Sequence, residues 1–412
     1  MRIGDTIRLV VESLSFGGDS VARLDGRVVF LDGGGPGDEV DARAWEVKAR
    51  FARAHVVAVT RGGPARVAPR CPLVARCGGC QWQEVALDEQ RRAKQAIVER
   101  ALGRLGCEVR PILGATEPFA YRSRARFTVG EDGALGFAAR RSHEIVDVAS
   151  CPLLDPALDR ALAAIREAIG GRARAGATVS LLVGRGGAVH AAIEGLSGDG
   201  AALLGLAGRA PITGVSVDGR RAGDELLDTG DDGEAAFSGS AAGFAQASHA
   251  GNRALRRVVT EEMTAGGAPA RVLELYAGDG NFTRDVARYA KEIVAVEGER
   301  SAAGRISDNA RGPARVTALG EPAEQAVRRL AAEGARFDAV LLDPPRAGAA
   351  ALAPLLAALA PRVVYVSCDP MTLARDARTL SDGGLRPRRA TPLDLMPHTF
   401  HVETVCRFDR DG

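Results

Sequence analysis

Val272–Thr283 reads VLELYAGDGNFT, an apolar strand that runs into a glycine-rich turn and then into the start of a helix. The glycines Gly278 and Gly280 let the backbone approach a ligand closely. About twenty residues further on, the next apolar strand ends at Glu297, where a carboxylate can accept both hydroxyls of a ribose. The stretch therefore predicts a nucleoside-binding α/β unit. A dinucleotide site, which would require G-x-G-x-x-G, is the weaker alternative.

Around this stretch, residues 240–412 alternate between helical and strand patterns. Helices are expected at Asn252–Thr264 and Phe282–Tyr289. Strands are expected at Arg271–Tyr276, Glu292–Glu297, Phe337–Leu342, Val363–Ser367 and Thr404–Phe408. Such alternation predicts a mostly parallel, doubly wound sheet whose ligands lie at the carboxyl ends of the strands.

Two further strand ends carry reactive groups. LLDPPR (341–346) holds Asp343 in a rigid Asp-Pro-Pro turn, and VVYVSCDP (363–370) ends at Cys368. A thiol at this edge is a candidate nucleophile, with a small buried hydrophobe as the alternative. A turn from strand to helix favours a lowered pKa for Cys368.

The thiols of Cys71, Cys77 and Cys80 follow a C-x5-C-x2-C spacing, with glycines that free the backbone to wrap an ion. Cys151 can complete a set of four. Four thiolates hold either a tetrahedral zinc ion or an iron–sulfur cluster, and the spacing does not separate the two.

The sequence before residue 241 divides in two. Residues 1–60 show short strands with glycine turns between them, which predict a small β-barrel. Residues 61–240 are expected to form an α+β domain with the cysteines and a helix over Leu87–Gly106 that packs on the C-terminal domain.

From Ala42 to Arg126 there are 17 Lys and Arg against 7 Asp and Glu, an excess of 10 that favours a phosphate-rich partner. Alternating arginines that include Arg122 and Arg124 suit phosphate contacts, although surface salt bridges are an equal alternative.

Length and composition bound the rest. A chain of 412 residues, 46% hydrophobic and 26% charged, indicates a soluble protein of two or three domains. No signal peptide and no apolar run of about 18 residues are visible, so we expect a cytoplasmic protein with no membrane partner. The sequence indicates no obligate protein partner.

These motifs resemble known families. GDTIRLVVESLSFGGDSVARLDGRVVFLDGGGPGDEV is similar to a TRAM domain, an OB-like module of RNA-modifying proteins. The VLELYAGDGNFT stretch resembles motif I of class I S-adenosylmethionine methyltransferases, and Tyr276 at its strand end belongs to the expected cofactor site.

A methyl donor beside a thiol suggests one chemistry. A thiolate that adds to C6 of a pyrimidine makes C5 nucleophilic enough to take the methyl group. A general base must then remove the C5 proton. In LMPHTFHVETV (395–405), Glu403 is the expected base, with an edge-strand carboxylate as the alternative, and His401 is its neighbour or an oxyanion contact.

Together, SCDP, DPPR, AGDGNFT and PHTFHVETV resemble the RNA uracil-C5 methyltransferase family, and the cysteine spacing resembles its iron–sulfur members that act on ribosomal RNA. The resemblance implies S-adenosylmethionine as cofactor and a [4Fe-4S] cluster on Cys71, Cys77, Cys80 and Cys151. It also implies Cys368 as nucleophile, Glu403 as base, Asp343 on the uracil edge and beside the cofactor, and Gln246 on cofactor or base. Ser248 replaces the Asn that usually ends F-x-Q-x-N in this family. Transfer RNA is the alternative substrate.

Two readings of other kinds stay open. An amino methyltransferase would use Asp343-Pro344-Pro345 and leave Cys368 idle, but Arg346 stands where such turns carry an aromatic residue. A redox-sensing RNA-binding protein would use the cysteine set as its switch and would leave Cys368 and Glu403 unexplained.

Overall fold

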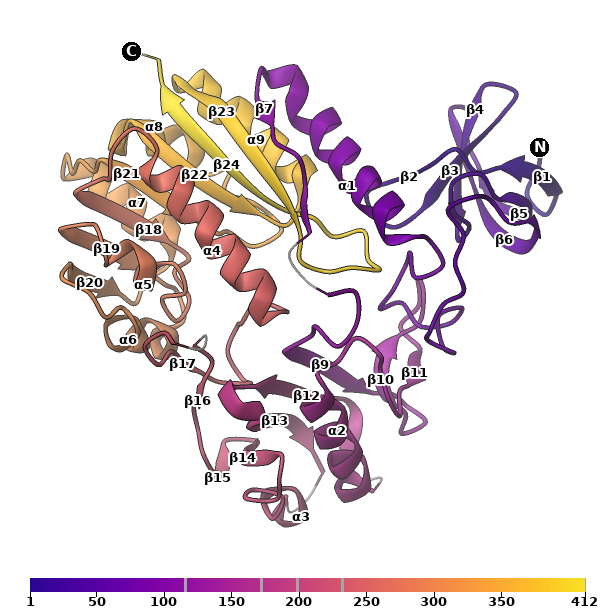
Figure 1. Cartoon of the computed structure of the whole chain (residues 1–412), viewed down its shortest axis with the longest axis horizontal. Helices are drawn as coiled ribbons and strands as arrows, with labels where there is room; N and C mark the ends of the chain where they lie inside the picture. Colours follow the sequence, from indigo (N-terminus) through magenta and orange to yellow (C-terminus); the bar gives the residue numbers. More distant parts are fainter. Residues whose placement is uncertain (115–116, 171–172, 198–199, 231–232, 412) are drawn as a thin grey trace.

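The computed structural model describes residues 1–114, 117–170, 173–197, 200–230 and 233–411. The chain forms three parts arranged around a central junction (Figure 1). None of the described helices is long and apolar enough to cross a membrane.

The N-terminal part is a six-stranded sheet in the order β1-β5-β6-β4-β3-β2. Inward-facing side chains, among them Leu9, Val29 and Leu31, form its own small core. β1 also packs against β3, so the sheet curls around that core. The strands are β1 (Thr6–Val10), β2 (Ser13–Leu14), β3 (Ser20–Leu24), β4 (Arg27–Asp32), β5 (Glu39–Val47) and β6 (Phe51–Arg61).

The central part is a seven-stranded sheet in the order β11-β10-β9-β12-β13-β14-β15. α2 packs on it through Leu158, Leu162 and Ile165, which recur at helical spacing and are fully buried. Its elements are β9 (Arg124–Val129), β10 (Leu135–Ala138), β11 (Ile145–Asp147), α2 (Pro156–Ile169), β12 (Ala173–Val183), the 3₁₀ turn η2 (Arg185–Gly187), β13 (Val189–Leu196), α3 (Ala201–Leu204), β14 (Ile212–Val217) and β15 (Arg220–Gly223). The short pair β16 (Leu227–Asp228) and β17 (Ser238–Gly239) follows.

The C-terminal part is a nine-stranded sheet in the order β20-β19-β18-β21-β22-β24-β23-β7, with β8 also paired to β23. β18 to β22 are parallel, as the sequence predicts, whereas β24 is antiparallel to both of its neighbours. Its strands are β18 (Arg271–Leu275), β19 (Glu292–Val296), β20 (Arg315–Leu319), β21 (Ala339–Leu342), β22 (Arg362–Ser367), β23 (Leu385–Asp394) and β24 (Glu403–Arg410).

Helices cover both faces of this sheet. One buried cluster joins α4 and α6 to one face, and another joins α7, α8 and α9 to the opposite face. The helices are α4 (His249–Thr264), α5 (Thr283–Val286), α6 (Arg300–Asn309), α7 (Ala323–Ala332), α8 (Ala353–Leu359) and α9 (Pro370–Asp382). The helix expected at Phe282–Tyr289 is only the short α5.

Residues 87–114 belong spatially to the C-terminal sheet. α1 (Leu87–Leu102), which ends in the 3₁₀ turn η1 (Gly103–Leu105), packs against α9 and β23 (Figure 1). β7 (Glu108–Val109) and β8 (Leu113–Gly114) then pair in parallel with β23. The chain therefore completes the edge of its last domain with a segment that precedes most of the central domain.

Candidate functional site

Four parallel strands of the C-terminal sheet end at one edge, and each is followed by a predicted site residue. Tyr276 follows β18, Glu297 follows β19, Asp343 follows β21 and Cys368 follows β22. Because the strands are parallel and in register, these residues lie together at one edge of the sheet, the edge at which α/β proteins bind ligands. The topology thus brings the predicted cofactor residues and the predicted nucleophile together.

The loop after β18 is shaped by its backbone. Tyr276 has a φ of 59° and its hydroxyl donates to Glu324 at 3.0 Å. The backbone N–H of Gly278 donates to Glu297 Oε2 at 2.8 Å, which ties the two strand ends together. Gly280 has a φ of 92°, and a Cβ there would lie 3.4 Å from Ile306 Cα. Glycine is required at Gly280 because the backbone is left-handed and α6 passes close by.

Side chains that the sequence reading did not single out support this loop. Thr283 donates to the buried Glu274 at 2.7 Å, and burial raises the pKa of Glu274 to about 8. Arg305 donates to Asp279 at 2.6 Å. The side chains of Asn252 and Asn281 exchange two hydrogen bonds of 2.8 and 2.9 Å, which join α4 to the loop. Of these residues, Asp279 alone has a local pattern in the sequence that could have marked it, because it is an acidic residue directly after Gly278.

Gln246 lies half-buried in the segment that leads into α4. Two residues later, Ser248 caps that helix, because its Oγ accepts the backbone N–H of Gly251 at 3.1 Å. Ser and Asn are both favoured N-cap residues. The exchange of Asn for Ser at this position therefore preserves the start of α4.

The register of β22 and β24 brings Glu403 next to Cys368. Ser367 pairs with Thr404, so the next position of this antiparallel register sets Cys368, just after β22, beside Glu403, the first residue of β24. Glu403 is only 5% exposed and Cys368 is half-buried. Asp343, at the neighbouring strand end, acts electrostatically on both of them.

The prediction of a lowered pKa for Cys368 is wrong. The pKa of its thiol is raised to about 11, mainly by burial and further by the carboxyl groups of Glu403 and Asp343, while Arg346 opposes them. Burial also raises the pKa of Asp343 to about 7 and that of Glu403 well above its ordinary value. Cys368 directly precedes Asp369, the N-cap of α9, but burial and the nearby carboxyl groups outweigh any effect of the helix start on its pKa.

Arg346 faces the same cluster. Its Nη2 lies 3.3 Å from His401 Nε2, and burial together with Arg346 lowers the pKa of His401 to about 4. His401 is therefore neutral near pH 7. The sequence reading treated Arg346 only as a departure from the amino-methylating turn, whereas here it is the cation that faces the thiol.

The two arginines expected to contact phosphate lie at different places. Arg122 lines the pocket that holds the four cysteines. Arg124, at the start of β9, donates from Nη2 to the carbonyl of Gly243 at 2.8 Å, just before α4. Burial lowers the pKa of Arg124.

The four predicted metal ligands line one small, largely apolar pocket with Leu73, Phe137 and Arg122. Burial raises the pKa of Cys77 and Cys151, and raises that of Cys80 to about 12. Within the described ranges, no group of three or more His, Cys, Asp or Glu side chains is arranged to hold a metal ion. The structure thus gathers the four thiols but does not show a metal site.

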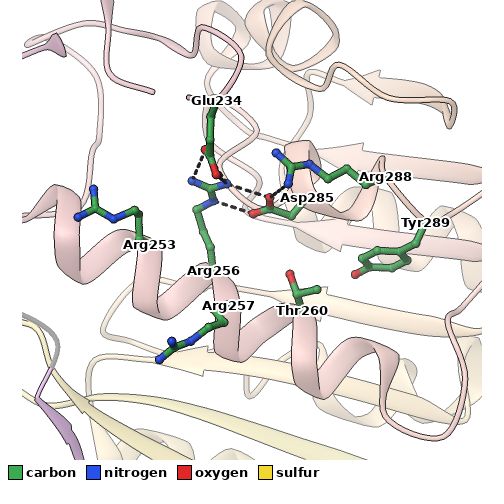
Figure 2. A pocket seen from close by; sticks show the side chains of 8 residues that line it. All are labelled: Glu234, Arg253, Arg256, Arg257, Thr260, Asp285, Arg288 and Tyr289. Atoms are coloured by element: carbon green, nitrogen blue, oxygen red, sulfur yellow. Dashed lines mark hydrogen bonds and ion pairs between the residues drawn. The ribbon is translucent and has the colours of Figure 1, made fainter. Parts of the chain in front are cut away.

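A separate pocket between α4 and α5 contains none of the predicted site residues (Figure 2). Arg256, which is buried, donates to Asp285 at 2.6 Å and to Glu234 at 3.2 Å. Arg256 is therefore part of an ion-pair network that joins α4, α5 and the segment before β17.

Comparisons with known proteins agree with this geometry. A family model described as TRAM domain matches residues 2–57, and one described as Conserved hypothetical protein 95 matches residues 254–368. The chain is 37% identical over 413 residues to the 23S rRNA (uracil(1939)-C(5))-methyltransferase RlmD of Edwardsiella ictaluri, with 95% of this chain and 93% of that protein covered. The RlmD protein of Klebsiella pneumoniae subsp. pneumoniae is 34% identical, with coverages of 98% and 96%.

One solved structure is similar along nearly the whole chain. It is the crystal structure of the Pyrococcus abyssi tRNA (uracil-54, C5)-methyltransferase in complex with S-adenosyl-L-homocysteine, with a TM-score of 0.74 and 23% identity over 98% of this chain and 100% of that chain. At this identity the likeness shows the fold alone. The predicted TRAM domain and the Rossmann-like methyltransferase domain are confirmed.

Proposed function

The chain belongs to the RNA uracil-C5 methyltransferase family, and on that premise we propose that it methylates C5 of one uridine in 23S ribosomal RNA. The observation that carries this proposal is the pairing of Ser367 with Thr404, which sets Glu403 beside Cys368 at the edge where the cofactor loop lies. Relatives of nearly full length that are named for this reaction support the choice of ribosomal RNA.

In the proposed mechanism the uridine is taken out of its stack and its uracil ring lies over Cys368. The sulfur of Cys368 bonds to C6, which makes C5 nucleophilic. S-adenosylmethionine, when bound, supplies an electrophilic methyl group. Glu403 then takes the C5 proton, the C5–C6 double bond re-forms and the thiolate of Cys368 leaves. Asp343 and His401 contact the uracil edge.

The cofactor loop fits S-adenosylmethionine. A Cβ built on Gly278 would meet nothing within 4 Å, so there is open space beside the loop for a ligand. Both oxygens of Glu297 already accept backbone N–H groups, from Gly278 and Glu299, at 2.8 Å each. These hydrogen bonds fix the orientation of the Glu297 carboxylate and leave further lone pairs that can accept ribose hydroxyls. Tyr276, Gln246 and Gly280 complete the proposed cofactor contacts.

The proposed proton transfers fit the buried carboxyl groups. A thiol with a raised pKa needs a proton acceptor close by when it attacks. Asp343, whose own pKa burial raises to about 7, is proposed to take the thiol proton, so that Glu403 stays free to take the C5 proton. Arg346 is the one of these neighbours that favours the thiolate. We propose that Arg346 stabilises the thiolate during attack.

The proposal includes a [4Fe-4S] cluster on Cys71, Cys77, Cys80 and Cys151. What supports a cluster is that the four thiols line one largely apolar pocket, since iron–sulfur clusters are held by cysteine thiolates. Iron and acid-labile sulfide assays on anaerobically purified protein are expected to find both elements. Zinc in place of iron would refute the cluster.

With RNA as its partner, the protein is proposed to act in the cytoplasm. The TRAM domain and the basic stretch that follows it are proposed to hold the RNA backbone, together with Arg122 and Arg124.

Mapping 5-methyluridine in total RNA from a strain that lacks this protein tests the substrate. We expect one 23S ribosomal uridine to lose its methyl group and to regain it when the gene is restored. Loss in transfer RNA instead would move the substrate to transfer RNA. No change in either RNA, with purified protein also inactive on both, would refute the function.

A further inference from the structure

The loop between β23 and β24, residues 395–402, carries His401 and leads directly into Glu403. Within the loop, Thr399 Oγ1 donates to the Met396 carbonyl at 2.8 Å. His398, at its centre, has a φ of 68°, a left-handed conformation that few residues other than glycine adopt. A backbone in this state persists only when its surroundings hold it.

Lys94, on α1, holds the start of the loop. Its side chain is fully buried, and Nζ donates to Asp394 Oδ1 at 2.5 Å and to the Met396 carbonyl at 3.1 Å. A buried lysine that lost this carboxylate would leave an uncompensated charge. The pair thus fixes one turn of α1 to the point where the loop leaves β23.

Gln90, one turn earlier on α1, holds the centre of the loop. Its Oε1 accepts the backbone N–H of His398 at 2.7 Å, and its Nε2 donates to the carbonyls of Trp82 at 3.0 Å and Val85 at 2.7 Å. This buried amide is therefore oriented from both ends. The strained residue is held by a side chain that is itself fixed.

Residues outside α1 also contact the loop. The backbone N–H groups of Gln81 and Trp82 both donate to the His398 carbonyl at 3.0 Å, and the Tyr121 hydroxyl donates to the Pro397 carbonyl at 3.1 Å. Phe16 packs edge-on against Phe400 at 5.3 Å. All of these partners lie at Tyr121 or earlier in the chain, and Figure 1 shows the loop extending from the sheet toward α1.

We infer that Gln90 and Lys94 are positioning residues for methyl transfer, which hold the 395–402 loop so that His401 and Glu403 face the base. Gln90 and Lys94 lie on α1 and not at the strand ends where the proposed substrate contacts are. Each is therefore inferred to act on the reaction through the loop. The inference rests on the proposed function. Its distinctive consequence concerns the step that follows the covalent adduct, because Glu403 acts only then.

Gln90→Met in the full-length protein tests the inference, with Gln95→Met as the matched control. Gln95 lies on the same helix and donates to Glu99 at 2.7 Å and to the Arg110 carbonyl at 3.2 Å, not to the loop. For Gln90→Met we expect kcat to fall at least about tenfold, the Kd for S-adenosylmethionine to stay within about twofold, and more enzyme to be trapped covalently on ordinary RNA. Gln95→Met should match the wild type in all three.

A merely structural role would lower adduct formation and turnover together, because both would follow the folded fraction. An unchanged kcat in Gln90→Met, or a loss of kcat without added adduct, would overturn the inference. If Gln90→Met does not fold, Lys94→Met/Asp394→Asn, which removes both buried charges, must give the same pattern of lower kcat and more adduct. A wild-type enzyme that forms no adduct on 5-fluorouridine RNA would instead refute the proposed function.

Discussion

Cys368 and the four pocket cysteines are all partly buried thiols, but their neighbours differ in charge. Cys368 has two carboxyl groups and Arg346 beside it, whereas the pocket thiols have one another and Arg122. Burial raises the pKa in both places, to about 11 for Cys368 and about 12 for Cys80. In the proposed mechanism a neighbouring carboxyl group takes the proton of Cys368 and can return it, whereas the pocket thiols are proposed to lose their protons to a bound cluster. The proposed roles differ accordingly, with reversible addition at Cys368 and ligation in the pocket.

Removal of the proposed nucleophile should have the largest effect on methyl transfer and none on the cysteine pocket. Cys368→Ala is expected to lower methyl transfer by more than about 10⁴-fold, because the nucleophile is lost. Iron content and S-adenosylmethionine binding should not change. Transfer of labelled methyl groups to RNA measures the rate. Cys107→Ala, which alters a buried cysteine in the core beneath α1, is the control and should stay active. Substantial activity in Cys368→Ala would favour an amino methyltransferase mechanism.

Removing the base should be the next largest effect. Glu403→Gln is expected to lower turnover about 10²- to 10⁴-fold, the range that general bases contribute. Because the C5 proton can no longer leave, the adduct on ordinary RNA should accumulate and appear as a shifted band on a denaturing gel. Glu261→Gln, a change at an exposed glutamate on α4, should behave as the wild type. An inactive Glu403→Gln with no adduct would assign this residue to an earlier step.

Arg346 should set the pH dependence of the reacting region. In the proposed mechanism the thiol of Cys368 and the carboxyl of Glu403 both act in ionised form, and both have raised pKa values, so the rate should rise as pH increases. Arg346 lowers the pKa of both groups, so Arg346→Gln should move the profile to higher pH. If the substitution raises the pKa of Cys368 by about 1, the thiolate fraction at neutral pH falls about tenfold. Rates of single turnover across a pH series measure this, and an unmoved profile would contradict the role.

The smallest effect on chemistry should come from the pocket. If the proposed cluster is present, Cys80→Ser is expected to lose iron and to lower the midpoint of thermal unfolding, because ligation would stabilise the folded chain. Adduct formation per folded molecule should persist. Visible absorbance, calorimetry and trapping on 5-fluorouridine RNA measure the three quantities. If adduct formation disappears while the protein stays folded, the two regions are coupled more closely than the contrast implies.

Many residues of the candidate site could be predicted because their positions depend on local sequence pattern. Gly278, Gly280, Glu297, Asp343 and Cys368 each follow an apolar strand, and parallel strands bring their ends together. The position of Glu403 beside Cys368 is different, since it depends on the antiparallel register of β24. No local pattern specifies that register.

What the sequence could not reveal depends on contacts far apart in the chain. Lys94 and Asp394 are 300 residues apart, and Gln90 and His398 are 308 apart. Contacts between residues so far apart produce no periodic pattern in the sequence from which they could be predicted. The wrong pKa direction for Cys368 has the same origin, because the turn is local, whereas the burial and the carboxyl groups that raise the pKa come from other parts of the chain.

The most direct test of the covalent mechanism is mass spectrometry of the wild-type enzyme after reaction with 5-fluorouridine RNA and S-adenosylmethionine. Trypsin releases Cys368 within the peptide Val363–Arg375. A covalent mechanism through Cys368 predicts that this peptide carries a methylated fluorouridine nucleotide bonded to the sulfur. A nucleotide on another peptide, or methylated RNA with no modified peptide, would contradict it.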